Sequence, residues 1–223
     1  MPGSIRLPGS SGDYASAPDT AAYNLNDTFF LAAFAALDDW TPGAVCSLIG
    51  QFTAAGNQRA YLLRIGGSGN IQMQASDNGT TNETASSGIP GFANGTAHWV
   101  GASFNAGTIQ GYDGGTDIDL PVWVAAGGTG SFGSVVACHN STGLLEIGSI
   151  NAGTSQICVG NVYRAAMYSD VAATIAVFDA DFTKISNADV AAGTFIESQG
   201  ATVTFNGNVS VVGDPSRFLV SGV

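Results

Sequence analysis

Short apolar runs alternate with clusters of Gly, Asn, Asp and Ser along the whole chain. Runs bounded by turn residues in this way are typical of β-strands. No stretch combines a helix cap with a 3.6-residue apolar period over about ten residues, so no long helix is predicted. The pattern predicts strands at 27–40, 44–52, 59–65, 71–76, 98–104, 108–113, 144–150, 159–169 and 174–182, a short strand at Val122–Val124, and two or three more within 193–212.

The run DTFFLAAFAALDDW, at 27–40, is the most ambiguous of these. Its alanines would suit a helix, yet apolar residues fill both alternating sets. Phe30 and Phe34 belong to one set, and Phe29 and Leu31 belong to the other. A strand that is buried on both faces has this pattern, and we therefore expect such a strand here.

Two pairs of neighbouring runs are predicted to form hairpins. The runs 59–65 and 71–76 flank the glycine-rich turn GGSGN, and the runs 98–104 and 108–113 flank the short turn NAG. Tight turns of this kind join antiparallel strands.

Polar segments between the strands are predicted to be loops. The Asn- and Thr-rich span 77–88 is interpreted as a surface loop, and 114–133 as a long connection. We expect the loops 77–97 and 114–133 to face outward.

Strand number and spacing decide the fold class. About twelve or more short strands, separated by turn signals, predict an all-β, antiparallel two-sheet sandwich. No linker rich in Pro or like charge and no internal repeat divides the chain. We predict a single domain over 1–223, with a core at about 10–182 and C-terminal strands in 183–223 packing on it.

Few charges and an excess of acids narrow the classes of partner. Charged residues make up 10% of the chain, its net charge is −11, and Lys184 is its single lysine. The arginines are scattered, whereas nucleic-acid binding needs a basic patch that displaces counterions from phosphates. We therefore expect no nucleic acid and no membrane as partner, and no apolar run is long enough to cross a bilayer.

The N-terminal segment and the number of cysteines bear on the compartment in which the protein is expected to be found. The segment MPGSIRLPGSSGDY lacks the basic region and apolar stretch of a secretory signal, so we expect assembly or release in the cytoplasm. The three cysteines, Cys46, Cys138 and Cys158, are odd in number and widely spaced. Their number and spacing argue against a disulfide framework and against a zinc site, and we expect burial as small apolar side chains.

Several segments follow one another in a familiar order. Trp99 lies in one strand, a turn follows, and the next strand ends in Tyr112-Asp113-Gly114. Further on stand LEIGS at 145–149 and GNVYRA at 160–165. Over about residues 10–182, this order resembles the laminin-G-like (concanavalin A-like lectin/glucanase) jelly-roll domain.

The resemblance implies a concanavalin A-like jelly roll and, more narrowly, the copies found in bacteriophage tail or head-surface proteins. A non-enzymatic virion structural protein would then sit at the virion surface, assembled in the host cytoplasm and released by lysis. Its partners would be other virion proteins, copies of itself and host cell-surface polysaccharide, with apolar strips such as SRFLVSGV (216–223) docking to neighbours. A free lectin-like carbohydrate-binding module and a glucanase-like hydrolase are the alternatives, since fold alone does not decide function.

Residues suited to catalysis are few. The glucanase relatives carry Glu-x-Asp-x-x-Glu on one strand, which places two carboxylates for a retaining mechanism. The chain has three glutamates, none with a second acid two or three residues away: Glu83, Glu146 and Glu197. Two aspartate pairs stand two residues apart in loops or at strand ends: Asp117 with Asp119, and Asp179 with Asp181. His98 and His139 lack a nucleophile elbow, and we expect no enzymatic activity.

The acids around Tyr112-Asp113-Gly114 have two interpretations. Asp and Gly at a strand end supply the side-chain acceptor and the backbone freedom that a turn requires. Asp113, Asp117 and Asp119 could instead offer oxygen ligands to Ca²⁺, although their spacing is not that of an EF-hand. The turn is favoured and no cofactor is expected, with Ca²⁺ left open as the alternative.

Trp123 is the candidate ligand-binding residue. Sugar sites stack a pyranose ring on an aromatic side chain and bind its hydroxyls through amides and carboxylates. Trp123, in LPVWVAAGG, is expected to be the most exposed tryptophan, whereas Trp40 and Trp99 are expected in or beside the core. Its apolar neighbours also allow it to pack against the core or another subunit.

Overall fold

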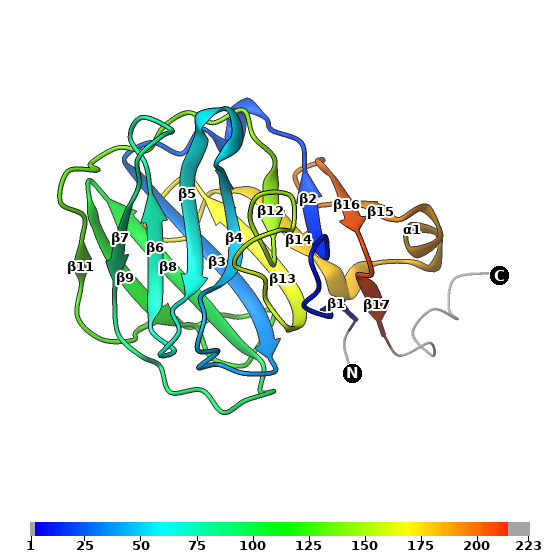
Figure 1. Cartoon of the computed structure of the whole chain (residues 1–223). Coiled ribbons are helices and arrows are strands. Elements are labelled where there is room, and N and C mark those ends of the chain that lie inside the picture. Colours follow the sequence, from blue (N-terminus) through cyan, green and yellow to red (C-terminus); the bar gives the residue numbers. More distant parts are fainter. Residues whose placement is uncertain (1–2, 214–223) are drawn as a thin grey trace.

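Two antiparallel β-sheets face each other in the computed structural model, which describes residues 3–213 (Figure 1). Sheet A follows the order β10 (Val124–Ala125), β9 (Thr108–Asp113), β8 (His98–Asn105), β3 (Thr28–Leu37), β13 (Gly160–Tyr168), β1 (Ser4–Leu7) and β17 (Ser210–Val212), with β11 (Gly130–Ser131) on β9 and β14 (Ala176–Asp181) on β13. Sheet B follows the order β15 (Thr194–Ile196), β16 (Thr202–Asn206), β2 (Tyr14–Ala17), β12 (Leu145–Ile147), β4 (Cys46–Thr53), β5 (Gln58–Ile65), β6 (Ile71–Ala75) and β7 (Glu83–Ser86). The predicted all-β, antiparallel two-sheet sandwich is confirmed.

Helical segments are short. The helix α1 (Asn187–Ala192) begins at a capping box formed by Ser186 and Asp189. Three 3₁₀ turns lie at Ala21–Tyr23, Ala55–Asn57 and Phe182–Lys184. Within residues 3–213, no helix has the length and apolar composition needed to span a membrane.

The ambiguous run at 27–40 is the strand β3, between β8 and β13. All of its residues after Thr28 are buried, as the double set of apolar residues predicts. Phe29 and Leu31 pack in the core between the sheets, whereas Phe30 and Phe34 pack in a smaller cluster on the outer face of sheet A. The expected hairpins are present as β5–β6 and β8–β9.

Four short strands were not predicted from the sequence pattern. The strands β1 and β2 precede the first predicted run, β7 lies inside the expected loop 77–88, and β11 lies inside the expected connection 114–133. The short strand expected at Val122–Val124 is β10, which starts at Val124. Such short segments carry little periodicity of their own. Their pairing with distant strands, such as that of β1 with β17 and β13, defines them.

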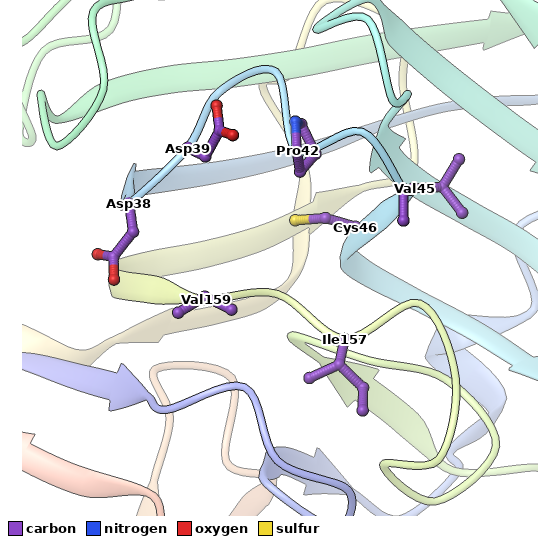
Figure 2. A pocket seen from close by; sticks show the side chains of 8 residues that line it. Asp38, Asp39, Pro42, Val45, Cys46, Ile157 and Val159 are labelled. Carbon is purple, nitrogen blue, oxygen red and sulfur yellow. The ribbon is translucent and has the colours of Figure 1, made fainter.

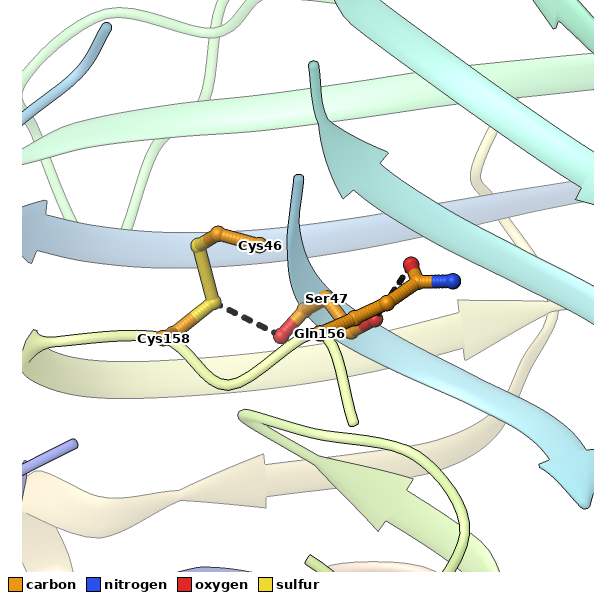
Figure 3. The surroundings of a disulfide bond; sticks show 4 residues. All are labelled: Cys46, Ser47, Gln156 and Cys158. Carbon is orange, nitrogen blue, oxygen red and sulfur yellow. Dashed lines mark hydrogen bonds between the residues drawn. A yellow bond between two sulfur atoms is a disulfide. The ribbon is translucent and has the colours of Figure 1, made fainter. Parts of the chain in front are cut away.

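Cys46 and Cys158 form a disulfide, with their Cα atoms 4.8 Å apart (Figure 3). The expectation of cysteines without a disulfide is therefore wrong for this pair. Their separation of 112 residues along the chain gives no sign that the start of β4 lies beside the segment before β13. Cys138 remains a free, half-buried cysteine.

The disulfide fixes the segment before β13 against β4. The backbone N–H of Ser47 donates to the carbonyl oxygen of Gln156 over 2.8 Å. Cys158 Sγ also lies 2.8 Å from the carbonyl oxygen of Ser47 (Figure 3). A bonded sulfur has no hydrogen to donate, so this contact is a hydrogen bond only when the thiol is free.

The C-terminal strands extend one end of each sheet. β16 pairs with β2 in sheet B, and β17 pairs with β1 in sheet A. The apolar strip SRFLVSGV, at 216–223, lies outside the described residues.

Candidate functional site

Trp123 packs on the outer face of sheet A. Its ring centroid lies 4.7 Å from that of Phe30 and 5.8 Å from that of Trp99. A Cβ added at Gly101 or at Gly114 would come within 2.8 Å of the Trp123 ring, so these two glycines make room for it. The residue is half-buried, and the packing alternative describes its surroundings in this chain. Trp40 and Trp99 are buried, as predicted.

Hydrogen bonds hold the segment that carries Trp123 over sheet A. The indole N–H of Trp99 donates to the carbonyl oxygen of Asp117 over 2.9 Å, and the Val122 N–H donates to that of Gly114 over 3.0 Å. Three neighbouring apolar side chains are instead exposed to solvent: Leu120, Val122 and Val124. The segment thus closes one part of the outer face and presents a small apolar surface of its own.

Asp113 and Asp117 support turns. Asp113 Oδ1 accepts the backbone N–H of Gly115 over 2.8 Å. Asp117 Oδ1 accepts the N–H groups of Asp119 and Leu120 over 3.0 and 3.3 Å. These contacts are the ones that the turn interpretation requires. In the described part of the chain, no group of three or more His, Cys, Asp or Glu side chains is placed to hold a metal ion, and the Ca²⁺ alternative remains a prediction.

The remaining acids considered for catalysis have structural partners. Glu146 accepts the backbone N–H groups of Ala152 and Gly153, and Glu197 accepts those of Gln199 and Ala201. Glu83 binds the backbone N–H groups of residues 133 and 134.

The aspartate pair on β14 is divided between two cations. Asp179 forms a bidentate ion pair with Arg164, with both N···O distances 2.7 Å. The Asp179 hydrogen bonds are the largest cause of the raised pKa of Arg164. Asp181 Oδ2 lies 2.8 Å from Lys184 Nζ. Burial would raise the pKa of Asp181, but hydrogen bonds from Lys184 and Thr183 and the charge of Lys184 outweigh it and lower this pKa.

A polar cluster on the outer face of sheet B has different properties. On β5, Tyr61, Leu63 and Ile65 face the core between the sheets, so Arg64 faces outward. Alternation on β6 and β7 likewise turns Gln72, Gln74 and Thr84 to the outer face. We define the Arg64 cluster as Ser47, Arg64, Gln72, Gln74, Thr84 and Gln156.

The acceptors of Arg64 in the described part of the chain are all neutral oxygens. Its Nε donates to Gln72 Oε1 over 2.9 Å, and its Nη1 to Gln74 Oε1 over 3.1 Å. Nη1 also reaches Gln156 Oε1 at 3.3 Å, and Nη2 reaches Thr84 Oγ1 at 3.2 Å. Strand register explains the assembly, because Arg64 lies opposite both Ser47 and Gln72.

Within the described residues, the charge of Arg64 is buried without a counter-charge. Only 8% of the residue is exposed, and it takes part in none of the ion pairs among residues 3–213. Burial lowers the pKa of the guanidinium. A buried cation held by neutral groups costs free energy that an anion would offset.

A pocket of about 340 Å³ adjoins the Arg64 cluster. Figure 2 shows Asp38 and Asp39, which follow β3, on one side, and Ile157 and Val159, which precede β13, on another. Cys46 and Ile157 line the pocket, and the next residues along the chain, Ser47 and Gln156, belong to the Arg64 cluster. The segments that line the pocket thus also carry two members of the Arg64 cluster. The pocket combines apolar side chains with the carboxylates of Asp38 and Asp39.

Sequence reasoning missed this cluster, because Arg64 was only one of several scattered arginines. A signal was present in the predicted hairpin, where Arg64, Gln72 and Gln74 occupy the polar positions of two alternating strands. No such signal marked Gln156, because this residue lies in a loop, where its own φ is positive at 50°.

The fold is that of the laminin-G-like, concanavalin A-like jelly roll, as comparison with solved structures shows. A protein of Bacteroides ovatus ATCC 8483, described as a "putative carbohydrate binding protein", has a TM-score of 0.61 at 11% identity. The match covers 96% of this chain and 60% of that chain, so this chain spans less than two thirds of its length. No protein-family model and no curated protein matches the chain.

Two further structures have the same fold. The SAP-like pentraxin of Limulus polyphemus has a TM-score of 0.52 at 12% identity, over 92% of this chain and 95% of that one. Domains LG4-5 of the mouse laminin α1 chain have a TM-score of 0.50 at 15% identity, over 74% of this chain and 40% of that one.

Proposed function

We propose that the chain is a non-enzymatic carbohydrate-binding protein, and that the glycan binds on the outer face of sheet B at the Arg64 cluster. The observation that carries this proposal is the set of carboxamides, hydroxyls and one guanidinium on a single sheet face beside a pocket. A carboxamide offers both a donor and an acceptor, as a sugar hydroxyl does.

The adjoining pocket supplies apolar contact. Binding sites for small molecules combine apolar walls with a few well-placed polar groups, in volumes of about 300–1,000 Å³. Pro42, Val45 and Ile157 line this pocket and offer apolar surface to the C–H groups of a sugar. No aromatic platform is required in this arrangement, and Trp123 serves the packing of sheet A instead.

The fold supports the proposal without deciding it. Of the three structures compared, the Bacteroides ovatus protein has the highest TM-score, and it is described as carbohydrate-binding. Jelly-roll sandwiches nevertheless have many functions. The partners that the described acids have, which are backbone N–H groups and cations, support a role without catalysis.

We propose that this activity is located on a bacteriophage surface, because the sequence resembles the jelly-roll domains of phage tail or head-surface proteins. The exposed Leu120, Val122 and Val124 form an apolar surface suited to contact with neighbouring virion proteins or copies. Repeated copies would convert weak sugar contacts into avidity for a host envelope. An antiserum against the chain should label particles produced by the encoding genome in immunogold microscopy. Label that stays in the particle-free supernatant would favour a free lectin.

A glycan array tests the binding function. The purified chain, presented as multimers on beads to supply avidity, is applied to bacterial envelope polysaccharides and oligosaccharides. We expect saturable binding to a subset of them, and no release of reducing sugar over the same period. Absence of saturable binding under these conditions would overturn the proposal.

The same binding measurement is repeated with and without Ca²⁺. The Arg64 cluster contains no carboxylate, so we expect binding to be the same in EDTA as in millimolar Ca²⁺. Loss in EDTA would instead favour Asp113, Asp117 and Asp119 as a cation-supported site.

A further inference from the structure

The uncompensated charge of Arg64 has a consequence for the class of glycan. We propose that the Arg64 cluster binds the carboxylate of an acidic sugar, a hexuronate residue of an oligosaccharide, through the Nη1 and Nη2 groups of Arg64. This inference rests on the proposed function and names the ligand class of the same site.

The donor count leaves room for an anion. A guanidinium has five N–H groups, and the contacts to Gln72, Gln74, Gln156 and Thr84 use four of them. The remaining N–H is on Nη2. No side chain among residues 3–213 accepts it.

The two longest contacts lie on the edge that a ligand can reach. Thr84 is exposed and Gln156 is half-buried, and their oxygens lie 3.2 and 3.3 Å from Nη2 and Nη1. A carboxylate that replaces these neutral acceptors would bind both terminal nitrogens in the bidentate geometry that guanidinium groups favour. The hydroxyl of Thr84 could then donate to the sugar, and so could the N–H of the Gln156 carboxamide that does not bind Gln74 Oε1.

Electrostatics favour a single carboxylate. One carboxylate compensates one guanidinium, and a charge-assisted hydrogen bond in a desolvated position is stronger than a neutral one. The net charge of −11 and the carboxylates of Asp38 and Asp39 in the nearby pocket repel densely charged polyanions more than an oligosaccharide with a single carboxylate.

The test uses two ligands that differ at one group. An oligosaccharide that ends in glucuronate is compared with the same oligosaccharide ending in glucose, and with the methyl ester of the glucuronate form. Isothermal titration should show binding of the glucuronate form at least about tenfold tighter than that of the other two, as a charge-assisted pair implies. This ligand series needs no variant and remains informative if a substitution impairs folding.

Variants then assign the preference to Arg64. In Arg64→Gln we expect the ratio between the affinities for the acid and the neutral ligand to fall to about one, because a carboxamide carries no charge to pair with the carboxylate. Arg64→Lys should keep part of the preference. The matched control is Arg59→Gln, on the same strand, where the guanidinium binds the carbonyl oxygen of Thr80 and should not affect the ratio.

Each outcome has one meaning. Equal binding of acid, ester and neutral ligands by the native chain would overturn the inference and leave the proposed function in place. A preference that survives in Arg64→Gln would place recognition of the carboxylate elsewhere and overturn it as well. No binding of any member of the series, together with a blank glycan array, would overturn the proposed function itself.

Discussion

Cys138 differs from the two other cysteines in its chemistry. Cys46 and Cys158 form the disulfide, whereas burial of the Cys138 thiol raises its pKa to about 12. Because this pKa is far above 8, only about one thiol in ten thousand is ionised at pH 8, and the thiolate is the reactive form. The residue as a whole is half-buried, but its sulfur is desolvated.

Alkylation with iodoacetamide, followed by intact mass measurement, checks both assignments. At pH 8 the native chain should gain no label within minutes, and the denatured but unreduced chain should gain one, on Cys138. Denaturation with reduction should give three labels, one for each cysteine. Three labels without reduction would contradict the disulfide, and rapid labelling of the native chain would contradict the desolvated thiol.

At the scale of elements, alternation within a strand made much of the fold predictable. The strand β3 and the hairpins β5–β6 and β8–β9 follow directly from apolar positions and from the turns between them. Each depends on residues that are close in sequence, and burial of alternate side chains is a strong local constraint.

Elements defined by distant partners were not predictable in the same way. The strand β1 has four residues, and its place in sheet A comes from pairing with β13 and β17. The same holds for the disulfide, which joins segments 112 residues apart. Trp123 is the most exposed of the three tryptophans, as predicted. Its packing on sheet A was not predictable, because the space for its ring comes from Gly101 and Gly114, which are distant or turn positions.

The candidate site shows the same division. Arg64, Gln72 and Gln74 fall on one face through simple alternation, so three members of the cluster were within reach of the sequence. Gln156 joins them because the disulfide and the Ser47 backbone hold its loop against β4. Its position depends on tertiary contacts that no local pattern records.

At the scale of the whole molecule, the two outer faces of the sandwich have different surfaces. Sheet A carries an aromatic cluster that the segment around Trp123 partly covers, and the exposed side chains of that segment offer an apolar contact. Sheet B carries the Arg64 cluster, and the nearby pocket lies where the segments after β3 and before β13 meet the start of β4. Under the proposed function, the face of sheet A would contact neighbouring proteins and the face of sheet B would bind the glycan.

The most direct test of glycan binding on sheet B is a titration of the ¹⁵N-labelled chain with the glucuronate-terminated oligosaccharide, followed by NMR. We predict that the largest shifts fall on the Arg64 Nε–H and on the side-chain amides of Gln72, Gln74 and Gln156. The indole N–H of Trp123 and the backbone amides of Asp113, Asp117 and Asp119 should change little. Shifts confined to Trp123 and these aspartates, or none up to about millimolar ligand, the weak end of specific recognition, would contradict the account.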